Sequence, residues 1–236
     1  MTWVVTFDLD DTLYLERDFV RSGFAAVGAW LATERGVRGF EACAWRLFEA
    51  GRRGDIFDRV LPRLGVAPDG ALIRRLVRVY REHLPTIRLE PAAADLLGRL
   101  GGRCRLAVLT DGFHETQRRK ISALELEPWC RPIVCTDRWG REHWKPSPKG
   151  FLHIQEALGA APERCIYIGD NPAKDFRAPK ALGWRTLRVC HPQGQHARAA
   201  AASPLDEADA TVTSLDQLAV DDLLARHGCI DDRNHR

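Results

Sequence analysis

Two acidic residues near the N-terminus have the types and spacing needed for nucleophilic and acid–base chemistry. Asp8 and Asp10 follow an apolar run at residues 3–7 that has the composition of a buried strand. Side chains two apart on an extended backbone point to the same side, so one carboxylate can attack a substrate while the other moves protons. The alternative is that these acids only form a turn and a helix cap.

Two further motifs offer groups that bind phosphate. Thr110, Asp111 and Gly112 follow another strand-like run, and a hydroxyl with a glycine amide there can hold phosphate oxygens. Lys145 lies in a proline-containing segment, from which it can place a point charge beside a phosphate. The alternatives are a Thr helix cap with a turn glycine, and an ordinary surface lysine. Lysine is rare in this chain, with five against 30 Arg, which weakens the second alternative.

A fourth motif supplies ligands for a metal. Asp170 and Asp175 lie in a predicted strand-to-helix turn after a fourth apolar run. Carboxylates in such a turn are the hard oxygen ligands that suit Mg²⁺, which usually keeps waters and substrate phosphate as well. The alternative is a helix N-terminus that carries acids because the helix dipole favours them.

The elements that must position these residues alternate between strands and helices. Strands are expected at residues 3–7, 105–109, 133–135, 165–168, 186–189 and, more weakly, 210–212. Helices are expected between them, at residues 115–124, 148–158 and 173–182. This pattern predicts an α/β fold with a doubly wound, Rossmann-like parallel sheet, whose ligand site lies beyond the carboxyl ends of the strands.

One long segment interrupts the alternation with helical patterns only. They are expected at residues 19–33, 40–50, 56–64 and 72–83, separated by breaks that contain Gly or Pro. The predicted organisation is a catalytic core of residues 1–14 and 89–236, with a small helical cap domain, residues 15–88, inserted after the first strand. The alternative is that these helices belong to one continuous core.

All four motifs fall at successive strand ends in one order, and that order resembles the haloacid dehalogenase superfamily. Its pattern is Asp-x-Asp-x-Thr, then a Thr or Ser after the next core strand, a Lys, and Gly-Asp-x-x-x-x-Asp. The resemblance spans roughly residues 1–14 and 89–220, and no motif position departs from the pattern. The helical insert is similar to the C1-type caps of that superfamily, which help to choose the substrate.

The resemblance implies a role for each motif residue. Asp8 is the expected nucleophile, Asp10 the general acid and base, Thr12 the support of their turn, and Lys145 the cation that neutralises Asp8 and the phosphoryl group. The implied magnesium ligands are Asp8, Asp10 through its backbone carbonyl, Asp170 and Asp175. The implied phosphate-binding residues are Thr110, Asp111, Gly112 and Lys145.

The presence of Asp10 indicates which reaction of the superfamily to expect. Dehalogenase members lack an acid there and phosphonatases have a small residue, so the resemblance implies a magnesium-dependent phosphatase. Its substrate would be a small-molecule phosphate monoester, hydrolysed through an aspartyl phosphate. Two alternatives stay open: a phosphotransferase or phosphomutase of the same superfamily, and a non-catalytic binding module on the same fold.

Composition limits the partners that we expect. The formal charge of +3 comes from 35 basic and 32 acidic residues interleaved along the chain, so no nucleic-acid partner is indicated. No apolar run has the length of a membrane span, and no signal segment is recognised. Seven scattered Cys without a CxxC pair favour a reducing compartment. We expect a cytoplasmic monomer or homodimer.

The sequence also suggests roles for polar residues outside the four motifs. Glu16, Arg17 and Arg21 are expected to read the substrate because they lie at the start of the insert. Residues 191–209 are expected to form a surface loop with a short helix, in which His191 and His196 are solvated. The helix face that carries Arg74, Arg75, Arg78 and Arg81 is expected to be solvent-exposed, and the alternative is that one of these residues reaches a substrate anion. Asp11 is expected to be a turn residue.

Overall fold

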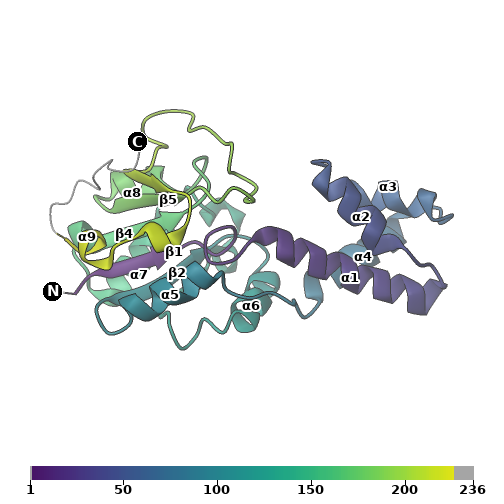
Figure 1. The fold of residues 1–236 in the computed structure, drawn as a ribbon, viewed down its shortest axis with the longest axis horizontal. Coiled ribbons are helices and arrows are strands. Elements are labelled where there is room, and N and C mark those ends of the chain that lie inside the picture. The colour runs from purple at the N-terminus through teal and green to yellow at the C-terminus, as the bar shows by residue number, and fades with distance from the viewer. Residues whose placement is uncertain (1, 226–236) are drawn as a thin grey trace. The chain divides into compact units, whose positions relative to one another are not determined.

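A computed structural model of the chain describes residues 2–225. These residues divide into two compact units, one of residues 2–16 with 88–225 and the other of residues 17–87 (Figure 1). In residues 2–225, no helix is long and apolar enough to cross a membrane.

The larger unit is built on one parallel sheet. Within the described residues it has six strands in the order β3-β2-β1-β4-β5-β6, and every pairing is parallel. The strands are β1 (Val4–Phe7), β2 (Arg105–Thr110), β3 (Ile133–Cys135), β4 (Cys165–Gly169), β5 (Arg185–Val189) and β6 (Ala210–Val212). The doubly wound parallel sheet expected from the sequence is therefore confirmed.

The strands form where short runs of β-branched and apolar residues are buried on both faces. Leu109 of β2 and Tyr167 of β4, the two strands that flank β1, pack with Phe151 and Ile154 in one hydrophobic cluster. Because side chains alternate along a strand, Phe7 points to the opposite face, where it is equally buried. A sheet apolar on both faces must be covered by helices on both sides.

The helices of this unit are α5 (Pro91–Leu100), α6 (His114–Ala123), α7 (Lys149–Leu158), α8 (Arg177–Ala181) and α9 (Val220–Leu223). Helix α5 was not expected, although Pro91 in its first turn is a usual start signal. Helix α8 is shorter than the expected helix at residues 173–182. The Asn171 backbone carbonyl accepts hydrogen bonds from the Lys174 and Asp175 amides, and this turn delays the helix.

The short helix expected within residues 191–209 was a wrong prediction. This stretch contains turns and bends without a helix. Pro192 and Pro204 lack the amide hydrogen that a helix interior needs, and Gly194 turns the chain between them. The stretch is therefore a loop between β5 and β6.

Strand β1 lies at the point where the strand order reverses. The chain runs outward from β1 to β2 and β3 on one side, then crosses to β4 and β5 on the other. The Asp8 amide donates to the Ile168 carbonyl at 2.8 Å, which keeps the ends of β1 and β4 together. A crevice beyond the carboxyl ends of the strands at such a switch point is the usual ligand site of an open α/β sheet.

The smaller unit is helical. It contains most of α1 (Glu16–Arg35), with α2 (Phe40–Glu49), α3 (Ile56–Arg63) and α4 (Gly70–Glu82). Its core gathers aromatic rings around Phe24, including Phe40 and Tyr80. A Cβ at Gly23 would lie 2.4 Å from the Tyr80 ring, so a glycine there allows α1 and α4 to approach closely.

Candidate active site

A pocket at the carboxyl edge of the sheet gathers residues from four motifs that are far apart in the sequence. Its lining includes Asp8, Asp10, Gly112, Lys145 and Asp170. Each follows a strand directly or lies in the loop after one. Three other predicted residues, Thr12, Thr110 and Asp175, are buried and do not line this pocket.

An ion triad lies at the base of the pocket. The Lys145 Nζ atom is 2.9 Å from Asp8 Oδ2 and 2.8 Å from Asp175 Oδ1. The lysine side chain is fully buried, and it also donates to the Tyr167 hydroxyl at 2.7 Å. The triad brings the predicted nucleophile, the predicted lysine and one predicted metal ligand into direct contact.

The charges in this triad depend on one another. Burial raises the pKa of Asp8, and the positive charge of Lys145 offsets this only in part. Burial also acts to lower the pKa of Lys145, but Asp175 and Asp8 raise it further, so the lysine stays protonated. For Asp175, burial is outweighed by Lys145, and its pKa lies below the ordinary value. A buried ammonium thus holds Asp175 ionised beside the nucleophile.

Three carboxylates converge where a cation could bind. One oxygen each from Asp8, Asp170 and Asp175 lies within 4.8 Å of the other two. Burial and then the charges of Asp175 and Asp8 raise the pKa of Asp170 to about 9. A Cβ at Gly169 would lie 2.7 Å from Asp175 Oδ2, so glycine at the end of β4 makes room for this carboxylate. Buried, mutually repelling carboxylates are a donor set that fits Mg²⁺.

Asp10 has a different environment from these three carboxylates. Its Oδ1 accepts hydrogen bonds from Lys120 Nζ at 2.6 Å and from the Tyr14 hydroxyl, and its Oδ2 accepts from Gln117 Nε2 at 3.0 Å. Burial acts to raise the pKa of Asp10, but Lys120 and these hydrogen bonds outweigh it and lower the pKa. Helix α6 thus holds the Asp10 side chain in place, apart from the three-carboxylate cluster.

The predicted phosphate-binding segment sits at the end of β2. Gly112 has a φ of 120°, a conformation that favours glycine, and a Cβ there would lie 3.2 Å from the Gln117 side chain. The Asp111 carboxylate accepts hydrogen bonds from the Thr136 hydroxyl at 2.7 Å and from the Lys145 amide at 3.1 Å. Its side chain therefore fixes the lysine segment.

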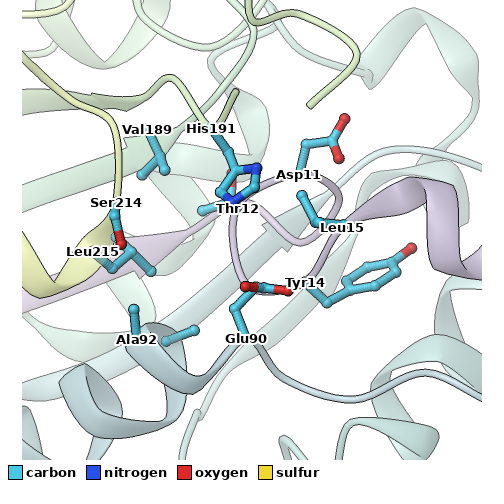
Figure 2. A pocket seen from close by; sticks show the side chains of 11 residues that line it. Asp11, Thr12, Tyr14, Leu15, Glu90, Ala92, Val189, His191, Ser214 and Leu215 are labelled. Carbon is cyan, nitrogen blue, oxygen red and sulfur yellow. The ribbon is translucent and has the colours of Figure 1, made fainter. Parts of the chain in front are cut away.

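Thr12 and Asp11 continue the loop after β1 beside a small hollow (Figure 2). The Asp11 and Tyr14 side chains leave this loop in different directions. Asp11 has a positive φ of 52°, and its carboxylate accepts hydrogen bonds from the amides of Glu16 and Gln195. Asp11 is thus more than the turn residue that was expected, because it ties the start of α1 to the β5–β6 loop.

Several residues at this site were missed from the sequence. The Lys174 Nζ atom lines the pocket, 3.7 Å from Asp8 Oδ2 and 3.6 Å from Asp111 Oδ2. Lys120 and Gln117 contact Asp10. The scarcity of lysine was the available signal, since three of the five lysines of the chain lie here.

The expectation for His196 needs revision, whereas that for Arg17 and Arg21 stays open. His196 was expected to be solvated, but it is half-buried at the pocket and its ring accepts a hydrogen bond from the Asn171 amide group at 3.1 Å. Each guanidinium of Arg17 and Arg21 lies over the Trp45 ring, at 5.3 and 5.4 Å from its centroid, and their expected contact with the substrate stays a prediction.

Glu16, the Arg-rich helix face and the cysteines were also considered in the sequence. Glu16 lines the pocket, where burial and the charge of Asp10 raise its pKa to about 7. The Arg-rich face of α4, with Arg74, Arg75, Arg78 and Arg81, is exposed as expected. Six cysteines in residues 2–225 are free thiols, and Cys229 lies outside the described residues.

Two curated proteins of similar sequence are named as phosphatases. Glyceraldehyde 3-phosphate phosphatase of Methanopyrus kandleri is 28% identical over 200 residues, which cover 80% of this chain and 84% of that protein. Phosphoserine phosphatase of Thermus thermophilus is 31% identical over 138 residues, or 58% of this chain and 54% of that protein.

A solved structure shows the same fold. The HAD-hydrolase YfnB of Bacillus subtilis, in a form bound to magnesium, aligns with a TM-score of 0.65 at 20% identity over 94% of this chain and 98% of that one. The model of the haloacid dehalogenase-like hydrolases matches residues 4–183, well over half of the sequence. The resemblance stated from the motifs is confirmed: the chain belongs to the haloacid dehalogenase-like hydrolases, and it is an enzyme.

Proposed function

We propose that this enzyme is a magnesium-dependent phosphatase that hydrolyses a small-molecule phosphate monoester through an aspartyl phosphate on Asp8. The observation that carries the proposal is the pocket in which Asp8 and Lys145 meet the carboxylates of Asp170 and Asp175. Relatives named as phosphatases support the same class of reaction.

The residues around Asp8 give the attack its geometry and charge balance. Lys145 reduces the repulsion between the Asp8 carboxylate and an approaching phosphate dianion, because its ammonium lies 2.9 Å from Asp8 Oδ2. Thr110 and the Gly112 amide stabilise charge that develops on the equatorial phosphate oxygens. Lys174, at the pocket wall, adds a second positive charge on the same side.

Asp10 is the proposed proton donor and acceptor. Its protonated carboxyl group gives a proton to the leaving oxygen as Asp8 forms a bond to phosphorus. The resulting carboxylate then takes a proton from the water whose oxygen bonds to phosphorus as the bond between Asp8 and phosphorus breaks. This step restores Asp10 as an acid and Asp8 as a carboxylate. Asp10 suits this role because its side chain is 21% exposed at the pocket, while that of Asp8 is 2% exposed.

The proposed metal site consists of the side chains of Asp8, Asp170 and Asp175, together with the Asp10 carbonyl that the family resemblance implies. When bound, Mg²⁺ would neutralise negative charge on the substrate phosphate and the carboxylates. In our proposal residues 17–87 act as the cap that selects the substrate, and the enzyme works in the cytoplasm. A phosphotransferase would differ in needing an acceptor alcohol in place of water.

The experiment that tests the proposal replaces the nucleophile. Asp8→Asn should abolish release of inorganic phosphate from p-nitrophenyl phosphate in the presence of Mg²⁺, because an amide cannot form the aspartyl phosphate. Asp95→Asn, an exposed carboxylate on α5, is the matched control and should retain activity. Circular dichroism should show the same fold in both variants. Undiminished turnover by Asp8→Asn would overturn the proposal.

A substrate panel follows if Asp8 is essential. It should include glyceraldehyde 3-phosphate and phosphoserine, since these are the substrates in the names of two relatives. Phosphate release without an added acceptor alcohol supports hydrolysis. Turnover that depends on such an acceptor supports a phosphotransferase.

A further inference from the structure

Helix α6 turns two polar side chains inward, against Asp10. Lys120 is 3% exposed and Gln117 is 2% exposed. They lie three residues apart, so they share one face of the helix. Lys120 Nζ is 2.6 Å from Asp10 Oδ1, and Gln117 Nε2 is 3.0 Å from Asp10 Oδ2.

A buried lysine needs a specific reason. Removing an ammonium group from water costs several kcal/mol unless a paired charge and hydrogen bonds compensate. An apolar residue at position 120 would let α6 pack against the sheet without that cost. The buried member of the pair is the lysine, with a side chain 4% exposed, whereas the Asp10 side chain is 21% exposed at the pocket. The lysine is therefore placed to serve the carboxylate.

The hydrogen bonds distinguish the two oxygens of Asp10. Oδ1 accepts from both Lys120 and the Tyr14 hydroxyl, which occupies its two lone pairs. Among the described residues, Oδ2 accepts one hydrogen bond, from Gln117, and it keeps a lone pair free. Gln117 also donates to the Thr110 hydroxyl oxygen at 2.6 Å, which links Asp10 to the phosphate-binding segment.

We propose that Lys120, with Gln117, is a positioning residue that fixes the Asp10 carboxyl group so that Oδ2 exchanges the proton with the leaving oxygen. The inference rests on the proposed function. Neither residue touches the substrate in this proposal. They act through Asp10 by filling Oδ1 and by holding the plane of the carboxyl group relative to Thr110.

The test compares leaving groups that differ in their need for a proton. Dinitrophenolate leaves readily without protonation, whereas phenolate and alkoxides need a general acid. In Lys120→Met, kcat for phenyl phosphate should fall by about 100-fold, the low end of the usual contribution of general acid–base catalysis. The kcat for dinitrophenyl phosphate should stay close to that of the unchanged enzyme, and KM should change little for both.

Two comparisons make the result specific. Asp10→Asn should show the same dependence on leaving group, and adding Lys120→Met to it should have little further effect, because both changes remove one function. Arg118→Met removes a charge from the exposed side of the same helix and should leave the dependence unchanged. An equal loss for all leaving groups in folded Lys120→Met would overturn the inference.

Gln117→Met provides a second variant if Lys120→Met does not fold. It removes the donor to Oδ2 but leaves the charge pair, so a smaller loss with the same dependence on leaving group is expected. A uniform loss in this variant would also count against the inference. Failure of the proposed function is distinguishable, because Asp8→Asn would then retain turnover, whereas here only the leaving-group dependence is at stake.

Discussion

Asp170 should bind a proton in the metal-free protein, and this makes stability depend on pH. Its pKa is about 9 in the folded protein, against an ordinary value of 3.8. At a pH between these values, the folded state holds a proton that the unfolded state has lost. The stabilisation is complete below 3.8 and disappears as the pH rises through about 9.

The size of the effect follows from proton linkage. One proton bound only by the folded state lowers the unfolding free energy by about 1.4 kcal/mol for each unit of rising pH. From about pH 5 to about pH 8 the upper bound for Asp170 is therefore about 4 kcal/mol. That is a large part of the roughly 5–15 kcal/mol that stabilises a typical domain.

Urea unfolding in EDTA, followed by circular dichroism at several pH values, measures this dependence. The buried cluster also contains Asp8, whose raised pKa acts in the same direction, so the informative quantity is the difference between variants. Asp170→Asn keeps the shape of the side chain but cannot titrate, and its stability should fall less steeply with pH. Asp95→Asn should follow the unchanged protein.

A parallel pH dependence in Asp170→Asn and the unchanged protein would refute the reasoning, because it would mean that Asp170 carries no extra proton when folded. Mg²⁺ supplies an internal check. A metal binds the deprotonated carboxylate, so saturating Mg²⁺ should stabilise the protein more as the pH rises.

Two further substitutions test other parts of the structure. Lys174→Gln should raise the KM for p-nitrophenyl phosphate, measured by steady-state kinetics, about tenfold, which corresponds to the loss of one charge-assisted contact. The control Lys149→Gln changes an exposed lysine and should leave KM unchanged. Equal KM values for Lys174→Gln and the unchanged enzyme would mean that Lys174 does not contact the substrate. Gly150→Ala should lower the free energy of unfolding by about 1–3 kcal/mol, because the added Cβ would lie 2.4 Å from Leu109 Cδ1 in the core. Urea unfolding measures this change, and an unchanged midpoint would contradict the packing described.

The sheet was predictable because its signals are local. Apolar runs of a few residues mark β1, β2 and β4, and the motif residues follow each run directly, as Asp8 follows Phe7. Once the strands are parallel, their carboxyl ends must meet at one edge, so the convergence of Asp8, Lys145 and Asp170 at one pocket follows from the order of the elements.

Local sequence was less informative where backbone hydrogen bonds in a turn decide where a helix begins. The expected helix at residues 173–182 is replaced at its start by a turn around Asn171, which places Asp175 beside Lys145. The helical spacing of apolar residues could not reveal this turn, because the turn depends on which backbone amides donate hydrogen bonds to the Asn171 carbonyl.

The sequence by itself determined the fold class, the family and the four motifs, because each is written in residue types and short spacings. The tertiary structure alone decided which charges meet. Lys120 contacts Asp10 across 110 positions of the chain, and Asp11 holds the Gln195 amide across 184. Such partners are chosen by burial and packing, since a charge removed from water must pair with whatever group the fold brings beside it.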